Sequence, residues 1–399
     1  MNAPAGGWPR IPLTRPSVGE AEAEAVRRVL LSGWLAQGPE VAAFEAEFAA
    51  YVGATHAVAV SSCTAALELL LHALGVGPGL EVVTPSHSFI AAANAIRRLG
   101  ARPVFVDIEP EGYNADPERI AAAIGPRTAA ILAVHQLGMP CDLAAIGAIA
   151  EARGVPLVED AACAAGSEIL RQGPWERIGR PHGVAACFSF HPRKIITTGE
   201  GGMITVRDEA FAARLRRLRA HGMDLDTHTR HLGGVVSERY EEAGFNMRMT
   251  DVQAALGRVQ LAGLDEEVRR RRVLAEGYAG KLRAIAGLRP PPEPGWARSN
   301  WQSYCVRLPD DVDQPAVMLR LADAGVASRR GVMCVHRERA YPAGSWSCRP
   351  DADCDGGACD RLRFSESAQD RSLQIPLFGA MTDAEQDQVV AALASACRP

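Results

Sequence analysis

The feature that most constrains the fold is an alternation of short, almost continuously apolar segments with helix-like segments in the first half of the chain. Strands without a polar face are buried on both sides, as in a parallel sheet covered by helices. The sequence therefore predicts an α/β fold in which a mostly parallel sheet is flanked by helices. We expect strands at 81–84, 103–108, 129–135 and 155–160, and helices at 64–75, 89–100 and 142–154.

The pattern changes after residue 250. TDVQ at 250–253 is typical of a helix-capping box, and helical spacing continues to about Ile285. A proline-rich connector, RPPPEPGWARSN, then precedes a mixture of short strands and helices. We predict a large α/β domain over residues 1–255, including an N-terminal segment, and a linking helix with a smaller C-terminal α+β domain over residues 256–399.

Composition excludes several classes of protein. A content of 47% hydrophobic and 23% charged residues is ordinary for a globular protein, and a net charge of −4 gives no footprint for nucleic acid. The longest apolar runs are far shorter than the roughly 18 residues that a membrane-spanning helix needs. The start, MNAPAGGWPR, has no apolar core after a basic segment, so we expect a cytoplasmic protein without a nucleic-acid or membrane partner.

Lysine is rare in this chain. Only Lys194 and Lys281 are lysines among 43 basic residues, and Lys194 lies in the stretch CFSFHPRKIITTGEGG. Arginine stays protonated, whereas a shielded lysine amine can lose its proton and condense with a carbonyl group. One interpretation of Lys194 is thus a Schiff-base lysine; the other is an ordinary surface lysine.

A Schiff-base enzyme that uses pyridoxal phosphate needs a helix N-terminus for the phosphate and a carboxylate for the pyridine nitrogen. SSCTAAL opens a predicted helix and offers the hydroxyls of Ser62 and Thr64, although an ordinary helix cap has the same pattern. Asp160 ends the strand VPLVED and is the candidate carboxylate, with the adjacent Glu159 as a residue that could instead be exposed. A helix cap is the alternative role for Asp160.

Two further positions fit the same cofactor. The ring needs a flat neighbour, and both His87 and Phe89 follow the strand EVVT, although an aromatic residue near a strand end also fits a core position. Ser189 precedes Lys194 by five residues and could donate to the phosphate. No GxGxxG after a strand, GxxxxGK[ST], HExxH or GxSxG motif competes with this set.

Longer stretches of the chain resemble a known family. SGWLAQGPEVAAFEAEFAAYVG, VEDAACAAGS, CFSFHPRKIITTGEGGMI and GFNMRMTDVQAALG are similar to segments of the DegT/StrS family of pyridoxal-phosphate-dependent sugar aminotransferases. The resemblance runs from about Ser32 to the C-terminus. It implies a fold type I transferase acting as a homodimer, in which each active site is completed by the neighbouring subunit.

The resemblance also implies roles for individual residues. Lys194 would form the internal aldimine as the catalytic lysine, and Asp160 would pair with the pyridine nitrogen. Asn246 would reach the phosphate of the neighbouring subunit's cofactor. The remaining expected cofactor contacts are Ser62, Cys63, Thr64, Ala65, Phe89, Cys163 and Ser189.

The chain departs from the family pattern at two of these positions. Cys163 stands where Gln or His commonly contacts the phenolic oxygen of the ring, and Cys63 stands where glycine is frequent. A third unusual feature is the loop SWSCRPDADCDGGACD, whose Cys348, Cys354 and Cys359 could bind zinc with His336. Without a CxxC pair we predict no metal site and interpret the loop as an insertion with reduced thiols.

The function that the resemblance implies is amino transfer from glutamate or glutamine to a keto-sugar or similar ketone, in secondary-metabolite or surface-sugar biosynthesis. Elimination or dehydration on the same cofactor is an alternative, although family members that dehydrate sugars tend to carry histidine in place of the lysine. A non-enzymatic regulator on the same fold is the third hypothesis. For a nucleotide-linked acceptor, candidate contacts at the pocket mouth are Arg230, Arg329, Arg330 and His336.

Overall fold

The computed structural model describes residues 10–171, 173–224, 238–348 and 360–398. Its centre is a seven-stranded sheet in the order β1-β9-β8-β5-β4-β2-β3. Every neighbouring pair is parallel except those of β9, which runs antiparallel to both β1 and β8. The predicted α/β class and mostly parallel sheet are therefore confirmed. The strands are β1 (His56–Val60), β2 (Glu81–Pro85), β3 (Arg102–Val106), β4 (Thr128–Val134), β5 (Leu157–Asp160), β8 (Ala185–Ser189) and β9 (Gly202–Val206).

Both faces of this sheet are buried, as the apolar strand sequences predicted. In β1, Ala57 and Ala59 join one core cluster, while Val58 and Val60 join the cluster on the opposite face. Helices α2 (Pro39–Val52), α5 (Pro117–Ala123) and α6 (Leu143–Arg153) pack in the first cluster. Helices α3 (Cys63–Ala73), α4 (Ala91–Arg98) and α7 (Glu209–Leu218) pack in the second.

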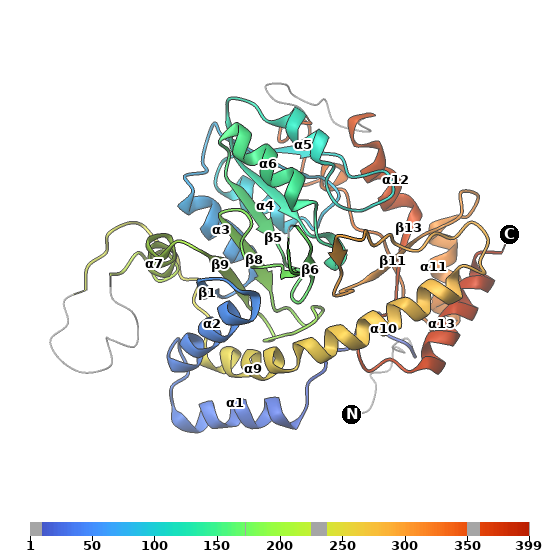
Figure 1. The fold of residues 1–399 in the computed structure, drawn as a ribbon, viewed down its shortest axis with the longest axis horizontal. Helices are drawn as coiled ribbons and strands as arrows, with labels where there is room; N and C mark the ends of the chain where they lie inside the picture. The colour runs from blue at the N-terminus through green and yellow to red at the C-terminus, as the bar shows by residue number, and fades with distance from the viewer. Residues whose placement is uncertain (1–9, 172, 225–237, 349–359, 399) are drawn as a thin grey trace.

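The predicted long helix after residue 250 is two helices. Thr250 caps α9 (Asp251–Ala262) through a capping box with Gln253, as predicted, but Gly263 separates α9 from α10 (Leu264–Leu282). Glycine is a poor helix former, but Gly257 and Gly277 lie inside these helices, so neither glycine content nor apolar spacing reveals the interruption. Figure 1 shows α10 leading from below the sheet toward α11 (Gln314–Asp323) and α13 (Asp383–Ala396).

A separate apolar core lies around the C-terminal part of the chain. It joins the far half of α10 to the antiparallel sheet β11-β13-β12 and to helices α11 and α13. The predicted domain boundary at residue 255 stays a prediction, although the first turns of α10 still pack in the core of the large sheet. The elements are β11 (Tyr304–Arg307), α11 (Gln314–Asp323), β12 (Arg329–Arg330), α12 (Arg363–Arg371), β13 (Ser372–Ile375) and α13 (Asp383–Ala396).

Several short elements complete the described residues. A small sheet is formed by β6 (Glu168–Ile169), β7 (Glu176–Arg177) and β10 (Ala297–Arg298), and α1 (Glu20–Ser32) contacts α9 (Figure 1). Three 3-10 turns, η1 (Gln136–Gly138), η2 (Val335–Arg337) and η3 (Asp360–Leu362), lie in the connections. Within the described part of the chain, no helix combines the length and apolar character needed to cross a membrane.

The RMTD part of the family-like motif has a structural role. The buried Asp251 carboxylate accepts hydrogen bonds from the backbone N–H groups of Gly38, Glu40 and Val41, at 2.7, 3.1 and 3.0 Å. These are the otherwise unpaired donors at the N-terminus of α2. A residue more than 200 positions away in sequence thus caps this helix and fixes α9 against it.

Asp251→Ala should lower the free energy of unfolding by about 2–3 kcal/mol, because it leaves three buried N–H groups without an acceptor. Asp208 provides the matched control, since its exposed side chain caps α7 through a single bond to Phe211 N. We expect Asp208→Ala to cost about 1 kcal/mol. Chemical denaturation of both variants measures the difference; equal losses would contradict the role given to Asp251.

Candidate active site

A cavity of about 360 Å³ opens where the carboxyl ends of the parallel strands meet. Ligands bind at this edge in open α/β sheets, so its lining is the set to inspect. The wall formed by the large sheet brings together residues that are far apart in sequence. They are Ser62, Cys63 and Thr64 after β1, Phe89 after β2, His135 after β4, Asp160 and Cys163 at and after β5, and Ser189 and Lys194 at and after β8.

The loop that carries Lys194 is held by its own backbone. Phe190 N donates to Gly201 O at 3.0 Å, and Phe190 O accepts from Thr198 N and from Thr197 Oγ1, both at 2.9 Å. Beneath the loop, Phe190 packs against Phe44 with ring centroids 5.3 Å apart. The FSFHPRKIITTGEGG stretch therefore folds into a closed, anchored loop that presents its lysine to the cavity.

Lys194 lies against Cys163, with its Nζ 3.0 Å from the thiol Sγ. Burial alone would lower the pKa of the lysine, as its sequence context suggested, but Cys163, Cys63 and Asp160 outweigh burial and raise it. The amine is therefore protonated before a cofactor arrives. The role of Lys194 as a Schiff-base lysine stays a prediction; these polar neighbours favour the charged form of its amine in the cofactor-free protein.

The two adjacent acids at the end of β5 have different surroundings. Glu159 is fully buried and accepts hydrogen bonds from His182 N at 2.7 Å and Gly183 N at 3.1 Å, with His135 Nε2 at 3.3 Å. Burial opposes its charge, but His135 and His182 outweigh burial and lower the pKa of Glu159. The idea that Glu159 could be exposed is wrong; it is a structural anion behind the cavity.

Asp160 faces the cavity and has capacity for another donor. Its Oδ1 accepts from Ala162 N at 3.0 Å, the only hydrogen bond to this carboxylate among the described residues. Burial raises the pKa of Asp160, against the opposite effects of Ala162 N–H, Lys194 and His135. A buried acid with so little compensation favours a cationic or N–H partner in the cavity.

The start of α3 is the expected phosphate site. Ser62 caps the helix by accepting from Ala65 N at 3.1 Å, and Thr64, the second residue of the helix, lines the cavity. The glycine pair of TGEGG explains how β9 reaches this turn: a Cβ on Gly202 would lie 2.5 Å from the carbonyl carbon of Ser62. Ala65 contributes the cap bond but does not line the cavity.

The two aromatic candidates after β2 have different environments. Phe89 is 62% exposed and lines the cavity, an unusual position for a large apolar side chain. His87 is fully buried and stacks on Tyr113, with ring centroids 5.8 Å apart. His87 as a ring-stacking residue is therefore wrong, and Phe89 is the available flat surface.

The opposite wall of the cavity comes from the C-terminal part of the chain. Arg329 and Arg330 of β12 line it, as predicted for the mouth, together with Arg193. The three arginines make this wall electropositive, and burial together with the neighbouring Arg193 and Arg330 lowers the pKa of Arg329. Sequence reasoning missed Arg193, whose only signal is its position next to Lys194.

Of the other two mouth candidates, only His336 is described, and it does not line the cavity. His336 is buried, with Nδ1 2.6 Å from Ser86 Oγ and Nε2 2.9 Å from Glu366 Oε1, so its placement at the mouth is wrong. Arg230 lies outside the described residues. Asn246 is exposed and does not line this cavity; its expected contact with a neighbouring subunit stays a prediction.

The zinc alternative also rested on residues that are only partly described. Cys348 is disulfide-bonded, so at this residue the expectation of a reduced thiol is wrong. Cys354 and Cys359 lie outside the described residues. Within the described ranges, no group of three or more His, Cys, Asp or Glu side chains could hold a metal ion.

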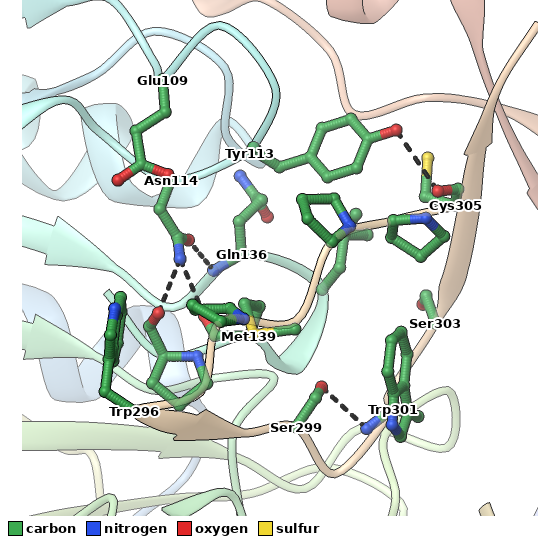
Figure 2. A pocket seen from close by; sticks show the side chains of 16 residues that line it. Glu109, Tyr113, Asn114, Gln136, Met139, Trp296, Ser299, Trp301, Ser303 and Cys305 are labelled. Carbon is green, nitrogen blue, oxygen red and sulfur yellow. Dashed lines mark hydrogen bonds between the residues drawn. The ribbon is translucent and has the colours of Figure 1, made fainter. Parts of the chain in front are cut away.

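A second, much smaller cavity of about 50 Å³ adjoins the first and shares Gln136, Leu137 and Ser303 with it (Figure 2). Asn114 closes one side by donating to Met139 O and Pro140 O at 3.1 and 2.8 Å. Proline and tryptophan side chains from the connector after α10 form much of the remainder. The reactive groups described above line the larger cavity, which is therefore the candidate active site.

Known proteins match the chain over nearly its whole length. The model of the DegT/DnrJ/EryC1/StrS aminotransferase family matches residues 16–394. The aminotransferase TlmJ from Streptoalloteichus hindustanus is 39% identical, with a TM-score of 0.86 over 97% of this chain and 98% of that one. DesV from S. venezuelae, solved with a ketimine intermediate, is 32% identical, with a TM-score of 0.85 over 98% and 100%.

A third similar protein has been solved in two forms that differ in the cofactor. Spr1654 from Streptococcus pneumoniae, solved in its PMP form, is 26% identical, with a TM-score of 0.87 over 97% of this chain and 99% of that one. A PLP form of the same protein also matches. The expected fold and cofactor class thus agree with these solved structures.

Proposed function

The chain belongs to the DegT/DnrJ/EryC1/StrS aminotransferase family, and from this premise we propose that it moves an amino group from glutamate or glutamine to a keto-sugar or a related hydroxylated ketone. It is a pyridoxal-phosphate-dependent aminotransferase of fold type I. The observation that supports the proposal is that Asp160, at the end of β5, and Lys194, in the loop after β8, line the same cavity.

The residues of the cavity fit the cofactor. Asp160, a buried acid with one hydrogen bond, would hold the protonated pyridine nitrogen, and the exposed ring of Phe89 would cover one face. Ser62, Cys63, Thr64 and Ser189, which line the cavity, would bind the phosphate at the N-terminus of α3, while Ala65, whose N–H bonds Ser62 Oγ, would support that turn. When bound, the cofactor supplies an electron sink for the carbon next to the reacting nitrogen.

The chain's own groups would then handle binding and proton transfer. Lys194 would hold the cofactor covalently, be displaced by the amino donor, and act as general base and acid for the proton on the donor's Cα. Its amine starts protonated, so a proton must leave Nζ before the covalent bond forms. The thiol of Cys163, 3.0 Å away, would orient this amine; it stands where, by resemblance to the family, an amide or imidazole commonly contacts the phenolic oxygen of the ring.

The assembly is part of the same proposal. Asn246 lies exposed and away from the cavity of its own chain, which suits a contact with the cofactor of a neighbouring subunit in a homodimer. We propose a cytoplasmic homodimer with shared active sites.

The acceptor would sit against the C-terminal wall of the cavity. Arg193 and Arg329 would face an anionic group, such as the phosphates of a nucleotide-linked sugar. Elimination on the same cofactor is the second candidate chemistry. Retention of Lys194, the proton carrier that amino transfer requires, favours transamination.

Two half-reactions test this function. L-Glutamate or L-glutamine should convert the bound cofactor to its pyridoxamine form, with loss of the yellow colour and release of the keto acid. Adding keto-cyclitols, free keto-sugars and nucleotide-linked keto-sugars in turn should restore the colour with at least one acceptor. Release of an eliminated group without formation of the pyridoxamine form would instead support elimination.

A further inference from the structure

A short buried segment, Ser299–Gln302, lies between the two loops that carry the reactive groups. Ser299, Asn300 and Gln302 are almost inaccessible to solvent, and Trp301 between them has a φ of +51°, rare for a bulky residue. Figure 2 shows Trp301 N bonded to Ser299 Oγ, at 3.0 Å. Backbone strain of this kind persists only where the surroundings impose it, and it often marks a functional segment.

Asn300 holds the loop after β5. Its Nδ2 donates to Cys163 O and Ala165 O, both at 2.8 Å, and its backbone N donates to Ser167 Oγ at 3.0 Å. The fit leaves no room for a side chain at Gly138, where a Cβ would lie 2.1 Å from Asn300 Oδ1. The position of Cys163 is therefore fixed through its carbonyl.

Gln302 holds the lysine loop. Its Nε2 donates to Arg193 O at 2.6 Å, and its backbone N donates to Asn300 Oδ1 at 2.8 Å. These contacts form a closed cycle of hydrogen bonds. Lys194 Nζ bonds Cys163 Sγ, and the Cys163 carbonyl accepts from Asn300. Asn300 in turn accepts from Gln302, which bonds the carbonyl of the residue before Lys194.

The cycle also leaves one acceptor unused. Gln302 lines the cavity, and its buried Oε1 has no hydrogen-bond partner among the described residues. A segment built only for stability would be expected to avoid both a strained residue and an unpaired acceptor. Both features occur here in the segment that bonds the residue before Lys194.

We propose that Gln302 is a positioning residue for Lys194: by bonding the Arg193 carbonyl it sets the place of the lysine relative to Cys163 and Asp160. This inference rests on the proposed function, because it matters only if Lys194 holds the cofactor. Breaking the cycle would let Lys194 Nζ move away from the Cys163 thiol. The amine would then react more slowly with the cofactor, and a positive charge on Nζ after attachment would be less stabilised.

The experiment compares Gln302→Met with Gln314→Met. Gln314 is also buried and its Nε2 donates to Ser372 O at 2.6 Å, but it does not line the cavity. Pyridoxal phosphate is added to the cofactor-free full-length proteins, and attachment at Lys194 is followed by borohydride reduction and peptide mass spectrometry. The pH titration of the bound cofactor's absorbance and the Tm are measured as well.

We expect Gln302→Met to slow attachment by at least about tenfold and to lower the titration midpoint by about half a pH unit, with Gln314→Met close to wild type in both. Equal attachment rates and midpoints in the two variants would overturn the proposal, whatever their Tm. If Gln302→Met does not fold, Gln302→Glu, which keeps the shape but not the donor, decides in its place; if neither folds while Gln314→Met does, the segment serves stability and the proposal fails. Failure of wild type to attach the cofactor at Lys194 would instead contradict the proposed function.

Discussion

Lys194→Ala is expected to lower the rate of amino transfer by more than about 10⁴-fold, because one side chain supplies both the covalent attachment and the proton carrier. The chain offers one other lysine as a control. Lys281 pairs with Asp387 and Gln386 in the C-terminal part of the molecule and does not line the cavity. Lys281→Ala should keep wild-type activity.

The measurement is the single-turnover rate of the glutamate half-reaction, together with the visible spectrum of the purified protein. The Lys194→Ala protein should fold with a near-normal Tm, because it loses only a half-buried side chain that bonds a thiol. Turnover within tenfold of wild type in this variant would remove Lys194 from the mechanism.

Asp160→Asn should slow the same half-reaction by about 10²–10³-fold, because the amide keeps the shape of the acid but not the charge that stabilises a protonated ring nitrogen. The cofactor-free variant should be at least as stable as wild type. Burial raises the pKa of Asp160 in the folded state, so keeping it charged at neutral pH costs stability. The wild-type protein regains that stability as the pH falls, and the variant has no such gain.

The adjacent Glu159 is the matched control, because its pKa is shifted in the opposite direction from that of Asp160. The pKa of Glu159 is lowered in the folded state. Its contribution to folding stability is therefore fully present above the unfolded-state pKa of about 4.3 and is lost as the pH falls through the folded-state pKa. Glu159→Gln should cost about 3 kcal/mol at neutral pH by breaking the buried contacts with His135 and His182. Thermal unfolding and half-reaction rates separate the two acids; a Glu159→Gln protein that keeps its Tm and loses only catalysis would contradict this division.

The sequence predicted the large-sheet architecture well because the signals there are local. Apolar strands such as 129–135, caps such as Asp142 and the capping box at Thr250 each act within a few residues, and the structure confirms them. The interruption at Gly263 was missed because apolar spacing continues across it. Helical periodicity reports which face is buried and not whether the backbone is continuous.

In the candidate active site, too, some residues could be predicted from the sequence and others could not. Lys194, Asp160 and Phe89 lie at strand ends or in a distinctive motif, so sequence placed them in one cavity correctly. The roles of Glu159 and His87 could not be read, because which of two neighbouring residues faces the cavity depends on packing from distant segments. No sequence pattern marks Gln302, because its contact with Arg193 joins positions 109 residues apart.

The most direct test of the central claim is to reduce the holoenzyme with borohydride and find the modified peptide. Only two lysines can carry the label. The account predicts stoichiometric addition of the reduced cofactor to Lys194 and none to Lys281. Label on Lys281, or a holoenzyme that loses all its cofactor on denaturation after reduction, would contradict it.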